Sequence, residues 1–186
     1  RYRNFDDDPA IGDADRRIIG DTNPDFTYGL TTNFSWKNIS LSLFFQGMQG
    51  NDIYNGNLLN IGMASISNIT KDAYETRWTP DNYENAKWPR GTMAMTRSML
   101  LSDRYVEDGS YLKLKTLNLG YNFKPKWNGI DNIYVYCNVN NVFTITGYSW
   151  FDPDVNSFGG DASRRGVDIF SYPASRTWTF GFKLTF

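Results

Sequence analysis

The feature that most limits the fold of this chain is a repeated alternation of apolar and polar side chains with a period of two residues. The alternation is clearest over residues 177–186, where every even position is aromatic or aliphatic and every odd position is Thr, Gly or Lys. A period of two places successive side chains on opposite faces of an extended strand. The stretch is therefore predicted to be a strand with one apolar face, made by Trp178, Phe180, Phe182, Leu184 and Phe186.

The same alternation predicts four further strands, at residues 26–36, 39–46, 116–123 and 133–140. Only Lys37 and Asn38 separate the first two strands, and this spacing predicts a tight hairpin. Leu112 and Leu114 have the opposite parity to the apolar positions of the strand that follows them. Either a bulge lies near Thr116, or the segment before it already stands above a membrane.

Strand length favours a membrane setting over a water-soluble one. Strands of soluble sheets commonly have about 5–6 residues, whereas a tilted strand that crosses a bilayer needs about ten. Several of the predicted strands reach that length, and their second face carries Thr, Ser, Asn, Gly and Gln, which suit a wet lumen. The apolar face ends in aromatic rings, which are typical of protein surfaces at the membrane–water interface. The pattern predicts an all-β fold, a transmembrane antiparallel β-barrel.

Connection lengths predict which ends of the strands face outward. The connections at 37–38 and 124–132 are short, whereas those at 47–103 and 144–175 are long. Outer-membrane barrels have short periplasmic turns and long external loops, so external loops are expected at 1–25, 48–103 and 145–175. Five strands cannot close a barrel, because bacterial barrels start at about eight strands and an open edge in lipid would leave backbone groups unpaired. Residues 1–186, which begin without Met, are therefore expected to be the C-terminal part of a longer protein.

Composition excludes several classes of function. A chain with 17% aromatic residues is unlike a disordered one, and no apolar run is long enough for a transmembrane helix or a signal peptide. The net charge of −1 gives no reason to expect nucleic acid as a partner. With no His and the single Cys137, the usual zinc, haem and iron–sulfur ligand sets and the His-dependent nucleophiles are absent. No carboxylate pair has an evident catalytic setting, so an enzyme is not expected.

Motifs in five stretches resemble, in the same order, the C-terminal strands of SusC/RagA-like TonB-dependent transporters of Bacteroidetes. The stretches are Asp15–Gly20 with Asn23–Gly29, Phe44–Gly47 with Gln49–Tyr54, Glu107–Lys115 with Leu119–Tyr121, Asn141–Thr144 with Asp152–Asp154, and Pro173, Arg176, Thr177, Phe180, Gly181 and Phe186. The resemblance covers the chain from about Asp13 to its end.

The resemblance implies the last five strands of a plugged barrel of about 22 strands in the outer membrane of a Gram-negative cell. It further implies import of glycans or peptides, a SusD-like lipoprotein lid, energy from the TonB complex through the missing N-terminal region, and a possible dimer of SusC–SusD pairs. Outer-membrane lipid and the barrel-assembly machinery would be further partners. Two alternatives remain open, namely a secreted β-sandwich that binds carbohydrate and another TonB-dependent receptor, such as a siderophore importer.

Candidate substrate-binding residues lie in the predicted external loops. Their aromatic rings could stack on sugar rings, or they could pack the loops against one another or against the lid. Asp152 could orient a ligand, or with Asp154 could cap a turn at Pro153. The loop aromatics are Trp78, Tyr83, Trp88, Tyr148, Trp150 and Phe151.

The remaining candidates concern the wall, its assembly and metal. Trp178, Phe180, Phe182 and Leu184 are predicted to face lipid, and the terminal aromatic Phe186 looks like an assembly signal of outer-membrane proteins. Lys113 and Lys115 are expected to be loop-base or lumen charges. An acidic stretch resembles the calcium loop of some family members, but Pro9 interrupts it and it lacks the turn glycine. A solvated loop with no cofactor is favoured over calcium binding at Asp6, Asp7, Asp8, Asp13 and Asp15.

Overall fold

The computed structural model describes residues 3–5, 8, 12–61, 68–91, 102–126, 129–155 and 157–186. The chain divides into two compact units. The loop unit comprises Arg1–Thr22, Asp52–Glu107 and Val155–Ser171, and the strand unit comprises Asn23–Asn51, Asp108–Asp154 and Tyr172–Phe186.

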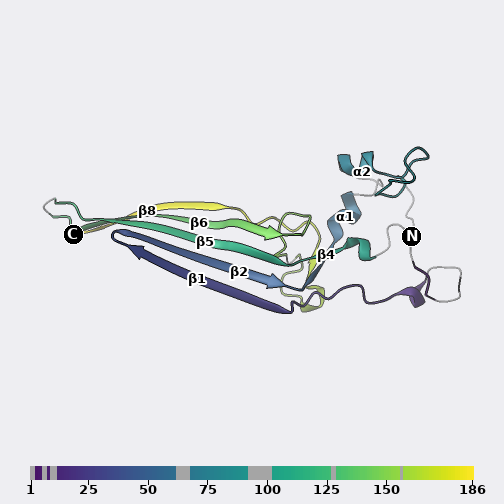
Figure 1. The fold of residues 1–186 in the computed structure, drawn as a ribbon, viewed down its shortest axis with the longest axis horizontal. Coiled ribbons are helices and arrows are strands. Elements are labelled where there is room, and N and C mark those ends of the chain that lie inside the picture. The colour runs from purple at the N-terminus through teal and green to yellow at the C-terminus, as the bar shows by residue number, and fades with distance from the viewer. Residues whose placement is uncertain are drawn as a thin grey trace. The chain divides into compact units, whose positions relative to one another are not determined.

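The strand unit is built on a five-stranded sheet with the order β1-β2-β5-β6-β8 (Figure 1). All neighbouring strands pair antiparallel, which confirms the predicted all-β antiparallel fold. The strands are longer than those of most soluble sheets, with 9 to 15 residues each. Their bounds are β1 (Phe26–Trp36), β2 (Ile39–Gln49), β5 (Tyr111–Phe123), β6 (Asn132–Thr146) and β8 (Thr177–Thr185).

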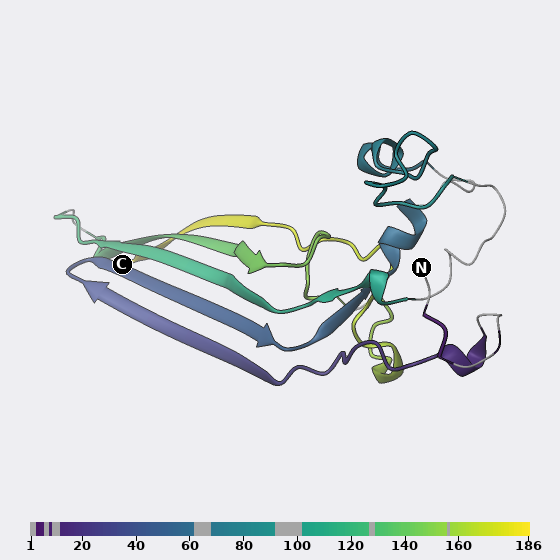
Figure 2. The ribbon, with the colours of Figure 1, turned by 45° about the vertical axis from the view of Figure 1, so that its right-hand side comes forward.

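One end of this sheet, here called the turn edge, gathers the short connections. The predicted hairpin is confirmed, because Trp36 pairs with Ile39 and only the two turn residues lie between them. The Asn122 N–H donates to the Asn38 carbonyl at 2.8 Å, which ties the β1–β2 turn to the end of β5. Figure 2 shows this turn, the β5–β6 connection and the C-terminus at the same end of the sheet.

The strand register keeps apolar side chains together on one face. Side chains opposite one another in a sheet share a face, so each row of side chains across the strands is either mainly apolar or mainly polar. One apolar row runs through Phe34, Leu41, Leu119, Cys137 and Phe180, and the adjacent polar row runs through Asn33, Ser42, Asn118, Asn138 and Thr179. The apolar face is exposed in this chain, with 73% of Phe180 and 71% of Phe182 accessible. The two-faced pattern predicted from the sequence is confirmed.

A bulge in β5 explains the change of parity seen in the sequence. Between the pairs Phe44–Thr116 and Phe45–Leu114, β5 contains one extra residue, Lys115. An extra residue restores the apolar side chains before it to the same face as those after it. Of the two alternatives offered by the sequence, the structure therefore shows the bulge. On the other side of β5, β6 carries its own irregularity at Asn141, whose φ of 53° lies in the left-handed region.

The loop unit contains short elements that the alternation did not predict. Its three-stranded sheet has the order β4-β3-β7, with β3 and β7 parallel. Ile53, Ala73 and Tyr105 are its most buried apolar side chains, each at most 1% exposed. No helix in the described ranges has the length and apolar character to cross a membrane. The elements are η1 (Asp13–Asp15), β3 (Asp52–Asn55), α1 (Gly56–Ile61), α2 (Lys71–Glu75), η3 (Asp103–Tyr105), β4 (Val106–Asp108), η4 (Ala162–Arg164) and β7 (Val167–Asp168).

Candidate functional site

A buried charged cluster on the polar face of the strand unit is the most distinctive group of polar side chains. Its centre is Lys113, which is 2% exposed and which the β5 bulge places on the polar face. The Lys113 Nζ lies 2.9 and 3.2 Å from the two carboxylate oxygens of Asp152 and 3.6 Å from an oxygen of Asp154. An ammonium group buried this deeply needs such partners, because desolvation of an unpaired charge is costly. We call these three residues the Lys113 cluster.

The segment that follows β6 is held in place by the same cluster. The Asp154 N–H donates to Asp152 Oδ1 at 3.0 Å, which closes a local turn over Pro153. Tyr148, at 5% exposure, is buried, and its N–H donates to the Thr146 hydroxyl at 3.1 Å. Asp152 therefore caps the turn, as one of the sequence interpretations held, and also neutralises the charge of a buried lysine.

Two aromatic rings lie between these anchored residues. The ring centroids of Trp150 and Phe151 are 4.8 Å apart, with an angle of 58° between the ring planes. Phe151 is 68% exposed. The indole N–H of Trp150 is buried and donates to no group in the described part of the chain. The predicted candidates Tyr148, Trp150 and Asp152 thus come together in one short, anchored segment.

Substitution of Lys113 by Met should destabilise this segment strongly. The change leaves the Asp152 carboxylate, whose side chain is 14% exposed, without its ammonium partner. Breaking one side of a buried ion pair typically costs about 3–5 kcal/mol. The measurement is the thermal unfolding and limited proteolysis of the full-length protein in detergent.

The matched control is Lys115→Gln, because Lys115 Nζ bonds only the neutral Gln46 Oε1, at 2.9 Å, among the contacts described. A hydrogen bond from an ammonium group to a neutral amide oxygen contributes about 1.5–3 kcal/mol, which is less than the cost of breaking a buried ion pair from one side. The double variant Lys113→Met/Asp152→Asn should recover part of the loss, since the carboxylate that remains, Asp154, has a side chain that is 43% exposed and can be solvated. Equal destabilisation by Lys113→Met and Lys115→Gln would contradict the importance of the pair.

The motif Glu107–Tyr111 supplies the junction that leads into β5. The Ser110 N–H donates to the Asp108 carboxylate at 2.9 Å, and the Ser110 hydroxyl accepts the Gly50 N–H at 3.0 Å. The Gly109 N–H donates to the Asn51 carbonyl at 2.8 Å. The Ser110 side chain and N–H lower the pKa of Asp108, so this carboxylate is charged at neutral pH. Its contribution to stability is present at neutral pH and is lost as the pH falls through its folded pKa.

Trp78 and Trp88 lie in the loop unit and pair with each other through the backbone. The Trp78 N–H donates to the Trp88 carbonyl at 2.7 Å. The indole N–H of Trp88 donates to Asp72 at 3.3 Å, and the Arg104 guanidinium lies 4.5 Å from the centre of the Trp88 ring. Trp88 is thus engaged in loop packing on its edge and one face, whereas Trp78 is 39% exposed.

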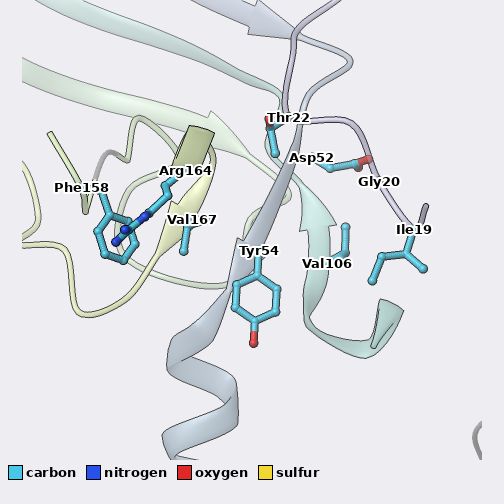
Figure 3. A pocket seen from close by; sticks show the side chains of 9 residues that line it. All are labelled: Ile19, Gly20, Thr22, Asp52, Tyr54, Val106, Phe158, Arg164 and Val167. Atoms are coloured by element: carbon cyan, nitrogen blue, oxygen red, sulfur yellow. The ribbon is translucent and has the colours of Figure 1, made fainter. Parts of the chain in front are cut away.

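The loop unit also has a partly open apolar hollow of about 430 Å³. Figure 3 shows Tyr54 from β3, Val106 from β4 and Val167 from β7 among the side chains that line it. Burial raises the pKa of the Tyr54 phenol above its ordinary value. The Arg164 guanidinium lies 4.7 Å from the centre of the Phe158 ring and 3.2 Å from the Asp161 carboxylate. The sequence pattern gave no sign of this hollow, because four segments that are distant in the sequence form it.

Gly166 should be the glycine least tolerant of substitution in this unit. Its φ is 71°, and a Cβ at this position would lie 2.8 Å from Thr22 side-chain atoms and 3.0 Å from the Asp52 carbonyl oxygen. Left-handed backbone strain costs about 1–2 kcal/mol for a residue with a Cβ, and the contact with a backbone oxygen adds to it. We expect Gly166→Ala to lower the melting temperature of the full-length protein and to expose the loop unit to trypsin.

Two neighbouring glycines separate the causes of that loss. Gly159 has a φ of 63° with nothing within 4 Å of a Cβ, so Gly159→Ala should show only the backbone strain. Gly160 has open space and no positive φ, so Gly160→Ala should be neutral. Equal melting temperatures for the Gly159→Ala and Gly166→Ala variants would refute the crowding argument.

Asp13 and Asp15, near the N-terminus, have protein partners. Asp13 pairs with Arg16 at 3.0 Å, and the Asp15 carboxylate accepts the N–H groups of Phe5 and Gly12 at 2.7 and 2.8 Å. Asp6 and Asp7 lie outside the described residues. Within the ranges that are described, no group of three or more His, Cys, Asp or Glu side chains is placed to hold a metal ion. The preference for a solvated loop over a calcium site stays a prediction.

Comparison with known proteins identifies relatives over the whole chain. TonB-dependent receptor P3 of Formosa agariphila is 36% identical over 193 aligned residues, covering 100% of this chain and 19% of the relative. TonB-dependent receptor SusC of Bacteroides thetaiotaomicron is 26% identical, covering 95% of this chain and 17% of the relative. No protein-family model matches the chain.

Solved structures give the same result for the fold. The RagAB peptide transporter aligns with a TM-score of 0.77 and 25% identity over 95% of this chain and 19% of that chain. The RagAB peptide importer in its closed-closed state aligns with a TM-score of 0.73 and 26% identity over 91% of this chain and 18% of that chain. The chain thus spans about a fifth of the length of the proteins it matches.

These findings define the class first: the chain is related along its entire length to TonB-dependent receptors. Within that class it is SusC/RagA-like, as the sequence motifs indicated, and that recognition is confirmed.

Proposed function

We propose that this chain forms part of the wall of an outer-membrane importer that takes up glycans or peptides. The observation that carries the proposal is the exposed apolar face, which extends across all five strands while the opposite face is mostly polar. Hydrocarbon tails are a suitable solvent for the apolar face, and a water-filled lumen suits the polar one. A secreted β-sandwich would cover such a face with a second sheet.

The remaining strands of the barrel and its partner proteins are proposed from the relatives. The outer strands β1 and β8 each have one edge with no partner in the described sheet, and a lipid-facing wall needs every edge paired. A closed barrel of about 22 strands would pair them. RagAB is a peptide importer by its description, and the proposed partners here are a SusD-like lipoprotein, the TonB complex and the barrel-assembly machinery. Pairs of SusC–SusD type could further dimerise.

The proposed role is transport and not catalysis. The polar face supplies the lumen, and the loop candidates Trp78, Trp88 and Trp150 supply rings for ligand contact, whereas the ring of Tyr148 is buried. The predicted external loops, at 1–25, 48–103 and 145–175, would carry the substrate vestibule. The terminal aromatic Phe186, which is 79% exposed, would serve assembly.

The facing of β8 is tested by a pair of lysine substitutions at adjacent positions. Phe180→Lys places a charge on the apolar face and should cost about 2–4 kcal/mol near the middle of a bilayer. Thr179→Lys places the same charge on the polar face and should be tolerated. The measurement is the amount of full-length, heat-modifiable protein in isolated outer membranes. Equal loss for both variants would rule out the assigned facing.

Import is tested with cells that express or lack the full-length transporter. Depletion of a defined mixture of oligosaccharides and oligopeptides from the medium is followed by mass spectrometry, with and without a proton uncoupler. We expect at least one component to be depleted only when the transporter is present, and only without the uncoupler. Identical depletion by both strains would contradict the proposal.

A further inference from the structure

The turn edge carries a set of exposed cations. Lys37 lies in the β1–β2 turn, and Lys124 and Lys126 follow β5 directly. All three are exposed, and none forms an ion pair with a described residue. Asp131 is the one side-chain carboxylate in the described parts of the two connections. This edge therefore has an excess of positive side chains.

Lys37 has a defined position on the lipid side of the wall. Its Nζ lies 4.8 Å from the centre of the Trp36 ring. Trp36 opposes Ile39 in the row of the apolar face nearest the turn and is 67% exposed. The Lys37 ammonium therefore lies beside the apolar face and not over the polar one. Its φ of 53° belongs to the tight turn that directs it there.

The apolar face next to these cations is rich in aromatic rings. Tyr121 and Phe123, at the end of β5, are 46% and 43% exposed, and Phe186 is 79% exposed. In transmembrane barrels, girdles of aromatic side chains lie at the boundary between the hydrocarbon and the headgroups. Lysine side chains beside such a boundary extend along apolar surface and place the ammonium among the headgroups.

We propose that the turn edge binds the phosphate groups of anionic phospholipids through Lys37, Lys124 and Lys126, with Trp36 against the lipid backbone. The proposal rests on the proposed membrane setting of the apolar face and adds a lipid preference to it. The charge complementarity favours phosphatidylglycerol-type headgroups over zwitterionic ones, because each lysine near an anionic surface contributes about 1 kcal/mol, or about fivefold in affinity. Zwitterionic lipid carries no net charge for the three ammonium groups to select.

The test uses the full-length transporter in nanodiscs of phosphatidylcholine alone or mixed with phosphatidylglycerol. Native mass spectrometry after detergent release measures how many molecules of each lipid remain bound. We expect the wild-type protein to retain phosphatidylglycerol selectively and to lose this selectivity at high salt. The variant Lys37→Gln should lower the preference about fivefold, and Lys37→Gln/Lys124→Gln/Lys126→Gln should lower it on the order of 100-fold.

Lys183→Gln is the matched control, because Lys183 pairs with Tyr134 on the polar face near the same end of the sheet. It should leave the lipid preference unchanged. Equal retention of both lipids by the wild-type protein, an equal loss in the Lys183→Gln variant, or no loss in Lys37→Gln would overturn the inference. If the triple variant does not fold, the Lys37→Gln variant and the high-salt measurement on the wild-type protein still test the inference. Failure of the wild-type protein to enter any bilayer would instead refute the membrane setting itself.

Discussion

The structure depends on one constraint, namely that every strand must keep its apolar side chains on the same face of the five-stranded sheet. A shift of register by one residue would turn a whole strand over and place leucines and rings on the polar face. The bulge at Lys115 satisfies this constraint where the apolar positions change from even to odd residue numbers. One extra residue returns Leu112 and Leu114 to the apolar face. The same step turns Lys113 toward the polar face, so the integrity of the wall and the position of the charged cluster have one local cause.

The Lys113 cluster links the wall to the segment that begins after β6. A buried ion pair gives little net stability compared with apolar packing, yet it is costly to break from one side. Such a pair therefore specifies position more than it adds stability. Here it fixes Asp152, and with it Trp150 and Phe151, to a strand of the sheet. A ring held in this way would lose little conformational freedom in the proposed contact with a ligand.

The alternation predicted the strand unit well because its physical cause is local. In β8, whether a side chain is apolar or polar indicates which face of the sheet it occupies. The β1–β2 hairpin followed from the two-residue spacing, and the bulge was one of two stated alternatives. The loop unit could not be predicted in this way, because β3 and β7 are two to four residues long and pair across more than a hundred positions. The partner of Lys113 was equally hidden, since an ion pair between residues 39 apart leaves no periodic signal.

Buried polar side chains, in place of a large apolar core, hold the backbone of the loop unit in position. Asn55, Asn57 and Asp168 are fully buried. The Asn57 side-chain oxygen accepts the Phe170 N–H at 2.6 Å, and the Asp168 carboxylate accepts the Ser171 N–H at 3.1 Å. Amide and carboxylate oxygens can bind backbone N–H groups that lack strand or helix partners, and buried N–H groups require such acceptors. A loop built in this way can keep a fixed shape while its outward side chains remain free for recognition, because the groups that hold the backbone point inward.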